Sequence, residues 1–356
     1  MTQPLRTALA ALALSFGMGL TGWANAHAVV ISHPPVADHH LHIFSAEGSR
    51  VLDLICKALG PKGCPPQRST APSTGADVLM ALDKAGIRDG VLLSGGYFFG
   101  SPEVADQHLD VAKGMRDENT FIVGEAKASC GRLSAFVSVP PLSPDAVAEI
   151  HYWGKKGGAT GLKLHLGSAR FDFRDPDQVG KLAAIFKAAG EEHLAIVIHM
   201  QTRLKDYGAE DAKIFLRDVY PMARGSIIQV AHAAGSGGVD DGELAALGAF
   251  AEAIAANPRS TKNLYFDLAM VPDLFANEGK IPASPAHVAA LEDLMHKIGL
   301  KRFLLGSDYV LGLDLKAYYA NEQSSLGLNA ADWRTLASNL APYIRSKSAR
   351  HCTVAR

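Results

Sequence analysis

The sequence has no excess of charge of either sign. Lys and Arg number 35 against 36 Asp and Glu, which gives a formal net charge of −1 with His neutral. Proteins that bind nucleic acid or anionic membranes by electrostatic attraction carry a basic excess. We therefore expect neither partner and predict a small-molecule substrate. The sequence leaves open whether the chain forms a homo-oligomer.

Charged residues make up only 20% of the chain, whereas apolar residues make up 48%. This composition argues against a disordered chain, because it supplies enough apolar surface for a sizeable core. A length of 356 residues exceeds the usual single domain, but a (β/α)₈ barrel routinely occupies this length as one domain.

Cysteine is scarce, with four residues in the chain: Cys56, Cys64, Cys130 and Cys352. Their spacings do not resemble those of a cysteine-rich zinc site. Cys56 and Cys64 lie in one segment rich in Gly and Pro and could close a small disulfide ring in an exported protein. Four unpaired thiols are the alternative.

One long apolar run is present, at the N-terminus. Arg6 precedes an apolar stretch over residues 7–20, and Ala24-Asn25-Ala26 follows as a small-x-small site. This pattern is typical of a secretory signal peptide cleaved after Ala26, with a second potential site after Ala28. An uncleaved anchor is the alternative, but it needs about 20 apolar residues to span a bilayer.

The predicted signal peptide determines the expected domain organisation and compartment. We expect a signal peptide over residues 1–26 and a single domain over residues 27–356. The mature protein is then periplasmic or secreted, and it is not attached to a membrane once the signal is cleaved.

Apolar strands alternate with helical patterns along the rest of the chain. Eight such units predict an α/β protein with a parallel sheet closed into a (β/α)₈ TIM barrel. An open doubly wound sheet is the alternative, but the G-x-G-x-x-G fingerprint after its first strand is missing. The expected strands cover residues 36–44, 88–94, 133–139, 160–166, 194–199, 226–232, 263–267 and 302–308, and the expected helices cover 75–85, 104–118, 144–156, 176–189, 210–220, 243–256, 285–298 and 330–345.

A long insertion follows the first strand, over residues 45–76, and is rich in Pro, Gly and Ser. Loops of this length are uncommon and are usually functional. We expect an irregular loop that forms a lid or rim over a site.

The first strand carries His40 and His42. Side chains on a strand alternate, so these two imidazoles project to the same side, about 6.6 Å apart along the strand. Two imidazoles at this spacing can bind one cation. A single H-x-H motif is weak evidence, and further ligands are needed.

Those ligands occur at the ends of other predicted strands. His199 ends the fifth strand, His232 the sixth and Asp308 the eighth, each after an apolar run. In a (β/α)₈ barrel the carboxyl ends of all strands meet at one face. The sequence therefore predicts a metal site at this face.

This ordered set resembles the amidohydrolase superfamily, and within it the amidohydrolase-related branch that includes aminocarboxymuconate-semialdehyde-decarboxylase-like proteins. The similarity covers most of residues 36–345. It rests on Asp38-x-His40-x-His42, Gly161-Leu162-Lys163-Leu164-His165, His199, His232-Ala233-Ala234-Gly235 and Gly306-Ser307-Asp308.

The resemblance implies one divalent metal ion held by four ligands, with a position left for water: His40, His42, His199 and Asp308. Mixed imidazole and carboxylate ligands favour Zn²⁺, with Mn²⁺ or Fe²⁺ as alternatives. Asp308 would also accept a proton from the water and pass it to the leaving group.

The resemblance gives His232 and Lys163 roles beside the metal. His232 would orient the water or polarise a substrate carbonyl. Lys163 is a substrate-facing cation in this interpretation, and the alternative is a carboxylated lysine that bridges a second metal. His165 shares the face of its strand with Lys163 and is a further substrate-binding candidate.

Two candidates for substrate binding rest on position alone. Arg203 lies just beyond His199 and could pair with a substrate carboxylate, although it could equally be a solvated loop residue. Tyr97 follows the second strand and could line an apolar wall. Asp267 ends the seventh strand, where we expect a structural role.

The leading hypothesis is a metal-dependent hydrolase that cleaves an ester, lactone or amide of a small molecule with a metal-activated water. Export fits this chemistry, since hydrolysis needs only water. The alternative is non-oxidative decarboxylation of an unsaturated or aromatic carboxylic acid at the same metal. A non-catalytic barrel that binds a metal or ligand is a third interpretation, disfavoured because all five expected positions are filled.

Overall fold

The computed structural model describes residues 33–60, 69–271 and 284–344. The expected signal peptide over residues 1–26 lies outside the described residues, as do Cys64 and Cys352. Both described cysteines, Cys56 and Cys130, are disulfide-bonded, so the alternative of four unpaired thiols is wrong.

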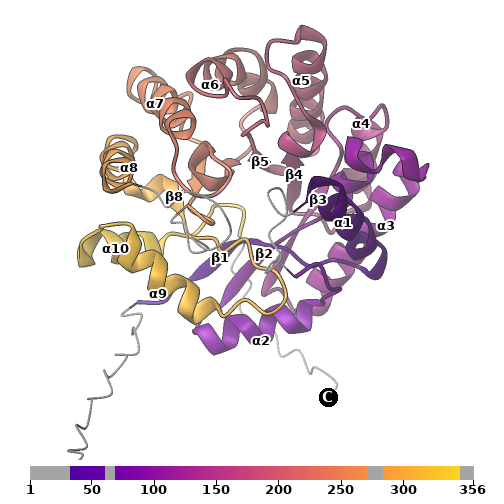
Figure 1. Cartoon of the computed structure of the whole chain (residues 1–356), viewed down its shortest axis with the longest axis horizontal. Coiled ribbons are helices and arrows are strands. Elements are labelled where there is room, and N and C mark those ends of the chain that lie inside the picture. Colours follow the sequence, from indigo (N-terminus) through magenta and orange to yellow (C-terminus); the bar gives the residue numbers. More distant parts are fainter. Residues whose placement is uncertain (1–32, 61–68, 272–283, 345–356) are drawn as a thin grey trace, which may run out of the picture.

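Eight parallel strands form the centre of the molecule, hydrogen-bonded in the order β1 to β8 (Figure 1). The barrel is closed by backbone hydrogen bonds between β1 and the chain after β8, where the His39 nitrogen donates to the Leu305 oxygen at 3.0 Å. The predicted (β/α)₈ barrel is confirmed. The strands are β1 Ala37–Leu41, β2 Asp89–Leu93, β3 Leu133–Ser138, β4 Gly161–His165, β5 Ala195–His199, β6 Ile228–Val230, β7 Leu264–Asp267 and β8 Phe303–Leu304.

The helices form a ring outside the strands (Figure 1). Apolar side chains fill the space between this ring and the barrel, and Trp153, Phe186 and Phe250 are among those with no more than 1% exposure. The helices are α1 Ala46–Leu59, α2 Gly75–Ala85, α3 Val111–Ala128, α4 Ala146–Lys156, α5 Pro176–Glu191, α6 Ala209–Ile214, α7 Asp241–Ala256, α8 Pro285–Ile298, α9 Leu315–Ser325 and α10 Ala330–Ser338.

The insertion after β1 begins as helix α1, so the expectation of an irregular loop is wrong for residues 46–59. The Ser45 side chain caps this helix by accepting from the Gly48 nitrogen. Val51 and Ile55, four residues apart, are buried on one face against Phe99 and Val104. Apolar side chains at this helical spacing stabilise a helix by packing.

Two expected helices differ from their ranges, and one helix was not expected. The segment at 104–118 is a 3₁₀ helix, Pro102–Gln107, followed by α3, because His108 has a left-handed φ of 48° that ends the first turn. The last helix, α10, ends at Ser338 rather than at 345, since the Asn339 side chain donates to the Leu300 and Phe303 oxygens. Helix α9 was not predicted.

Within the described ranges, every helix is too short or too polar to cross a bilayer.

Candidate active site

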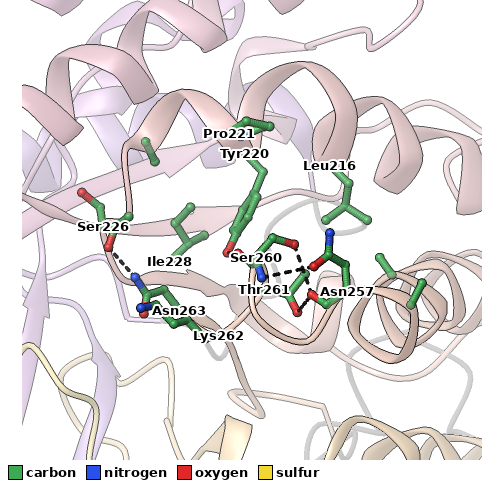
Figure 2. A pocket seen from close by; sticks show the side chains of 14 residues that line it. Leu216, Tyr220, Pro221, Ser226, Ile228, Asn257, Ser260, Thr261, Lys262 and Asn263 are labelled. Carbon is green, nitrogen blue, oxygen red and sulfur yellow. Dashed lines mark hydrogen bonds between the residues drawn. The ribbon is translucent and has the colours of Figure 1, made fainter.

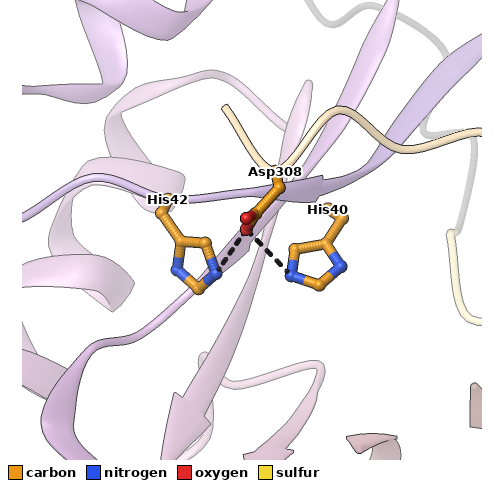
Figure 3. A group of neighbouring side chains, drawn as sticks. All are labelled: His40, His42 and Asp308. Atoms are coloured by element: carbon orange, nitrogen blue, oxygen red, sulfur yellow. Dashed lines mark ion pairs between the residues drawn. The ribbon is translucent and has the colours of Figure 1, made fainter. Parts of the chain in front are cut away.

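His40, His42 and Asp308 meet at the carboxyl face of the barrel. Asp308 Oδ1 lies 3.4 Å from His40 Nε2 and 3.3 Å from His42 Nε2. Figure 3 shows the two imidazoles on either side of the carboxylate. The ligand atoms of these three residues all lie within 4.8 Å of one another, which is close enough for them to hold one metal ion.

The other ring nitrogen of each imidazole is already hydrogen-bonded. His40 Nδ1 contacts Asp267 Oδ2 at 3.1 Å, and His42 Nδ1 contacts the Leu93 oxygen at 2.9 Å. A carboxylate and a carbonyl can only accept, so both Nδ1 atoms carry a hydrogen and Nε2 is the ring nitrogen that each histidine directs at Asp308. This is the tautomer that a metal-ligating histidine needs, and the donor set fits a divalent cation.

Burial keeps His40 neutral. Loss of solvent, together with the nearby positive charge of Lys163, lowers the pKa of His40 to about 3. A neutral imidazole at physiological pH is able to ligate a cation. Gly306 allows the close approach of the His40 backbone, because a Cβ at Gly306 would lie 2.8 Å from the His40 Cβ.

Asp267, for which the sequence predicts a structural role, orients two histidines of the site. It is completely buried, and its carboxylate accepts hydrogen bonds from His40 Nδ1, Gln229 Nε2 and the nitrogens of His232 and Ala269. Burial opposes ionisation, but the contacts of His40 and His232 hold the pKa of Asp267 below its usual value. The expected structural role is therefore too narrow, and its position at the end of β7 was the only sequence signal.

His232 lies beside the first three residues. Its backbone is left-handed, with φ 54°. Its backbone nitrogen donates a hydrogen bond to Asp267 Oδ1 at 2.9 Å. Its Nδ1 contacts the Ala269 oxygen at 2.6 Å, so this nitrogen carries the hydrogen and Nε2 is an acceptor. The His232 and His40 rings are 4.8 Å apart. Burial lowers the pKa of His232 and favours the neutral form.

His199 reaches the site but occupies a different position from the first three ligands. Its ring stacks on His165 at 3.9 Å and lies 5.0 Å from His232. Among the described residues, His40 lies close enough to share a metal ion with His42 and Asp308, and with His232 and Asp267. His199 belongs to neither group. Its role as the fourth ligand remains a prediction.

Three of the four predicted substrate-binding residues border this site. Lys163 is 1% exposed, and its Nζ lies 3.2 Å from His40 Nε2. His165 stacks between His199 and Tyr97, whose ring is 5.1 Å from it. Burial and the Lys163 charge lower the pKa of His165 well below its usual value.

Arg203, the fourth, points its guanidinium at a glutamate. Arg203 Nη1 lies 3.1 Å from Glu103 Oε1, and Arg170 Nη2 contacts the same oxygen at 3.0 Å. The sequence prediction missed Glu103 and Arg170, because they come from separate loops and share no motif with Arg203.

Two cavities lie at the opposite end of the barrel, away from these residues. The first, of about 400 Å³, is shown in Figure 2 and is lined by Ser226, Ile228 and Asn263, at the amino ends of β6 and β7. The second, of about 790 Å³, is lined by Leu133, Thr160 and other residues at the amino ends of β3 to β6. Catalytic residues of (β/α)₈ barrels occupy the carboxyl face, so we place the chemistry there.

Comparison with known proteins agrees with this geometry. The sequence model of the amidohydrolase family matches residues 37–320. No curated protein matches the chain in sequence.

Solved structures with this fold include a decarboxylase and hydrolases. A 5-carboxyvanillate decarboxylase from Novosphingobium aromaticivorans, complexed with manganese, is 15% identical and has a TM-score of 0.55, with 86% of this chain and 94% of that chain covered. A Pseudomonas putida protein assigned as a 2-pyrone-4,6-dicarboxylic acid hydrolase is 19% identical, with a TM-score of 0.53 and coverage of 85% and 94%. An amidohydrolase from Burkholderia multivorans with bound zinc is 15% identical, with a TM-score of 0.52 and coverage of 85% and 95%.

At these identities the structures show a common fold, whereas the family match extends over most of the chain. Together with the His-His-Asp group at the carboxyl face, the match confirms the resemblance predicted from the sequence. The protein belongs to the amidohydrolase family of enzymes.

Proposed function

We propose that the protein is a metal-dependent hydrolase of a small-molecule ester, lactone or amide. One observation carries the proposal: the Nε2 atoms of His40 and His42 converge on the Asp308 carboxylate at the carboxyl face of the barrel, each within 3.4 Å of Asp308 Oδ1. Each Nε2 atom faces inward because Nδ1 is fixed by Asp267 or by the Leu93 oxygen. Such an arrangement serves to bind a cation.

His40, His42 and Asp308 hold the metal in this proposal, and His199 completes the set. A bound divalent cation lowers the pKa of water to about 7 and so supplies a hydroxide nucleophile at neutral pH. Zn²⁺ is our first choice, because it favours mixed imidazole and carboxylate ligands. The zinc in the Burkholderia amidohydrolase supports this choice, whereas the manganese in the Novosphingobium decarboxylase supports Mn²⁺.

The remaining residues bind the substrate and move protons. Asp308 accepts the proton of the attacking water and returns it to the leaving group. His232, with Nδ1 fixed on the Ala269 oxygen, directs Nε2 toward the water or the substrate carbonyl. Lys163, buried beside His40, stabilises negative charge that develops on the carbonyl oxygen.

Decarboxylation of an unsaturated or aromatic acid is the second candidate. The positive charge of Lys163 next to His40 favours it, because a buried ammonium can hold a substrate carboxylate. The decarboxylase from Novosphingobium aromaticivorans shares the fold and supports it further.

Export to the periplasm or the medium belongs to the same proposal. The N-terminal pattern over residues 1–26 is typical of a signal peptide. The disulfide bonds of Cys56 and Cys130 support this location, because disulfides persist in oxidising compartments.

Metal analysis and a substrate screen test the proposal. We expect about one divalent ion per chain, loss of activity on chelation and recovery with Zn²⁺ or Mn²⁺. The screen compares lactones, esters, amides and aromatic carboxylates, with CO₂ measured throughout. Hydrolysis without CO₂ supports the hydrolase, and release of CO₂ from a carboxylate supports the decarboxylase. Wild-type metal content in a His199→Ala, Asp308→Ala double variant would overturn the ligand set.

A further inference from the structure

Three residues from different loops meet on the carboxyl face of the barrel. Glu103 lies in the 3₁₀ helix after β2, Arg170 follows β4 and Arg203 follows β5. Glu103 Oε1 is 3.0 Å from Arg170 Nη2 and 3.1 Å from Arg203 Nη1. The two nitrogens are therefore within about 6 Å of each other. We call Arg170 and Arg203 the arginine pair.

Glu103 is a buried anchor for the pair. Its side chain is 3% exposed, whereas those of Arg170 and Arg203 are 62% and 40% exposed. Glu103 Oε2 accepts from Ser101 Oγ at 2.5 Å, so both oxygens are occupied from within the protein. Burial opposes ionisation of Glu103, but Ser101 and Arg170 bring its net pKa below the usual value.

The charge of this group is unbalanced. Two guanidinium groups share one carboxylate, which leaves a net charge of about +1 at this point of the face. One arginine would be enough to neutralise Glu103 and connect the loops. Exposed ion pairs contribute only about 0–1 kcal/mol to stability, so a second one adds little. The second arginine is therefore not explained by the fold.

Both guanidinium groups also keep donors available. In the described part of the chain, each makes one hydrogen bond, to Glu103, and each carries five N–H donors. Planar guanidinium groups suit carboxylates, which they bind through two parallel hydrogen bonds. The available donors of the arginine pair can thus bind a second, external carboxylate.

The arginine pair borders the candidate active site. Arg203 follows His199 by four residues, and its charge is one of the causes, after burial and Lys163, that lower the pKa of His165. Ser168 connects the two regions, because its nitrogen donates to His165 Nδ1 at 3.0 Å and its carbonyl oxygen lies 3.4 Å from Ser101 Oγ, the hydroxyl that donates to Glu103.

We propose that the arginine pair, held by Glu103, binds a carboxylate of the substrate that is remote from the reacting group. The substrate class is then an anionic small molecule with a carboxylate at one end and the ester, lactone or amide at the other. This inference rests on the proposed function for the position of the reacting group, but the binding of a carboxylate does not require turnover.

Equilibrium binding tests it on the full mature protein loaded with Zn²⁺. Calorimetry compares glutarate and benzene-1,3-dicarboxylate, each beside its neutral dimethyl ester. We expect the dicarboxylates to bind more tightly than the esters. Arg170→Gln and Arg203→Gln should each weaken dicarboxylate binding about tenfold or more and leave ester binding unchanged. Arg203→Lys, which keeps the charge without the planar fork, should be intermediate.

Arg217→Gln is the matched control, because Arg217 is 66% exposed and pairs with its neighbour Asp218 on the outside of the barrel. Unchanged dicarboxylate binding in both pair variants overturns the proposal, as does equal weakening for acid and ester. Absence of dicarboxylate binding to the wild type also overturns it. A protein that binds dicarboxylates through the pair but hydrolyses nothing refutes the proposed function alone.

Discussion

His40 and Asp267 form a hydrogen-bonded pair that determines which nitrogen faces the candidate metal site. The 3.1 Å contact from Nδ1 to Oδ2 fixes the tautomer, and both side chains are completely buried. Carboxylates that orient metal-ligating histidines affect metal affinity nearly as strongly as the ligands do. Asp267 also holds the His232 nitrogen at 2.9 Å, so one carboxylate positions two histidines of the site.

Asp267 is not a proposed metal ligand, but its replacement should weaken metal binding because it orients one. We expect Asp267→Asn to reduce affinity for the divalent ion about 10–100-fold, because the amide no longer fixes the His40 tautomer. Competition with a chromophoric chelator measures the affinity. Asp241→Asn is the control, since the side chain of Asp241 is 97% exposed. Equal affinity in wild type and Asp267→Asn would show that the pair does not orient His40.

Substitution of His232 should lower turnover, whereas substitution of His199 should remove the metal. We expect His232→Asn to keep the metal and to lower kcat about 10²–10⁴-fold, the range of an acid–base group. Asn tolerates the left-handed backbone that His232 adopts, with φ 54°. His199→Ala should instead lose metal. Metal content by atomic absorption and kcat for the best substrate separate the two outcomes, and metal loss in His232→Asn would contradict the assignment.

The barrel and the first ligands could be predicted because they depend on local patterns. Apolar runs that lead into a histidine or aspartate mark the carboxyl end of a strand or the loop directly after it, and the parallel barrel brings these ends together. His40, His42 and Asp308 are therefore predictable from the sequence. In the structure each histidine Nε2 lies within 3.4 Å of Asp308 Oδ1.

Other features depend on side-chain directions that the sequence does not show. Asp267 was placed at a strand end, but its contact with His40 spans 227 positions and no spacing indicates it. Glu103 and Arg170 meet from separate loops, 67 positions apart. Helix α9 was missed because it carries a polar residue, Glu322, on its buried side, which obscures the helical apolar pattern.

Glu322 should make the folded state less stable as pH rises. Its carboxylate is fully buried, and both oxygens lack a hydrogen-bond partner in the described part of the chain. Burial and the negative charges of Asp38 and Asp267 raise its pKa well above the usual value. The folded protein then keeps a proton that the unfolded chain releases near pH 4.3, so stability decreases from that pH upward until the folded pKa is reached.

Glu322→Gln removes this ionisation and should flatten the pH dependence. We expect the Tm difference, variant minus wild type, to grow by about 2–4 °C or more between pH 4.5 and 8. Differential scanning calorimetry at a series of pH values measures it. Glu252→Gln, at an exposed position of α7, is the control. Parallel Tm curves for wild type and Glu322→Gln would exclude a buried proton at this residue.

Reduction should destabilise the protein, because Cys56 and Cys130 are both disulfide-bonded. Removal of a native disulfide typically costs about 2–5 kcal/mol of the free energy of unfolding. We therefore expect a lower Tm in the presence of a reductant. Alkylation of the denatured, unreduced protein should leave both cysteines unlabelled, and peptide mapping by mass spectrometry then identifies their partners. A double Cys56→Ala, Cys130→Ala variant is the control for direct effects of the reductant, because its Tm should respond less. Labelled Cys56 and Cys130 in protein purified from its native compartment would contradict both the bonded state and the support that it gives to export.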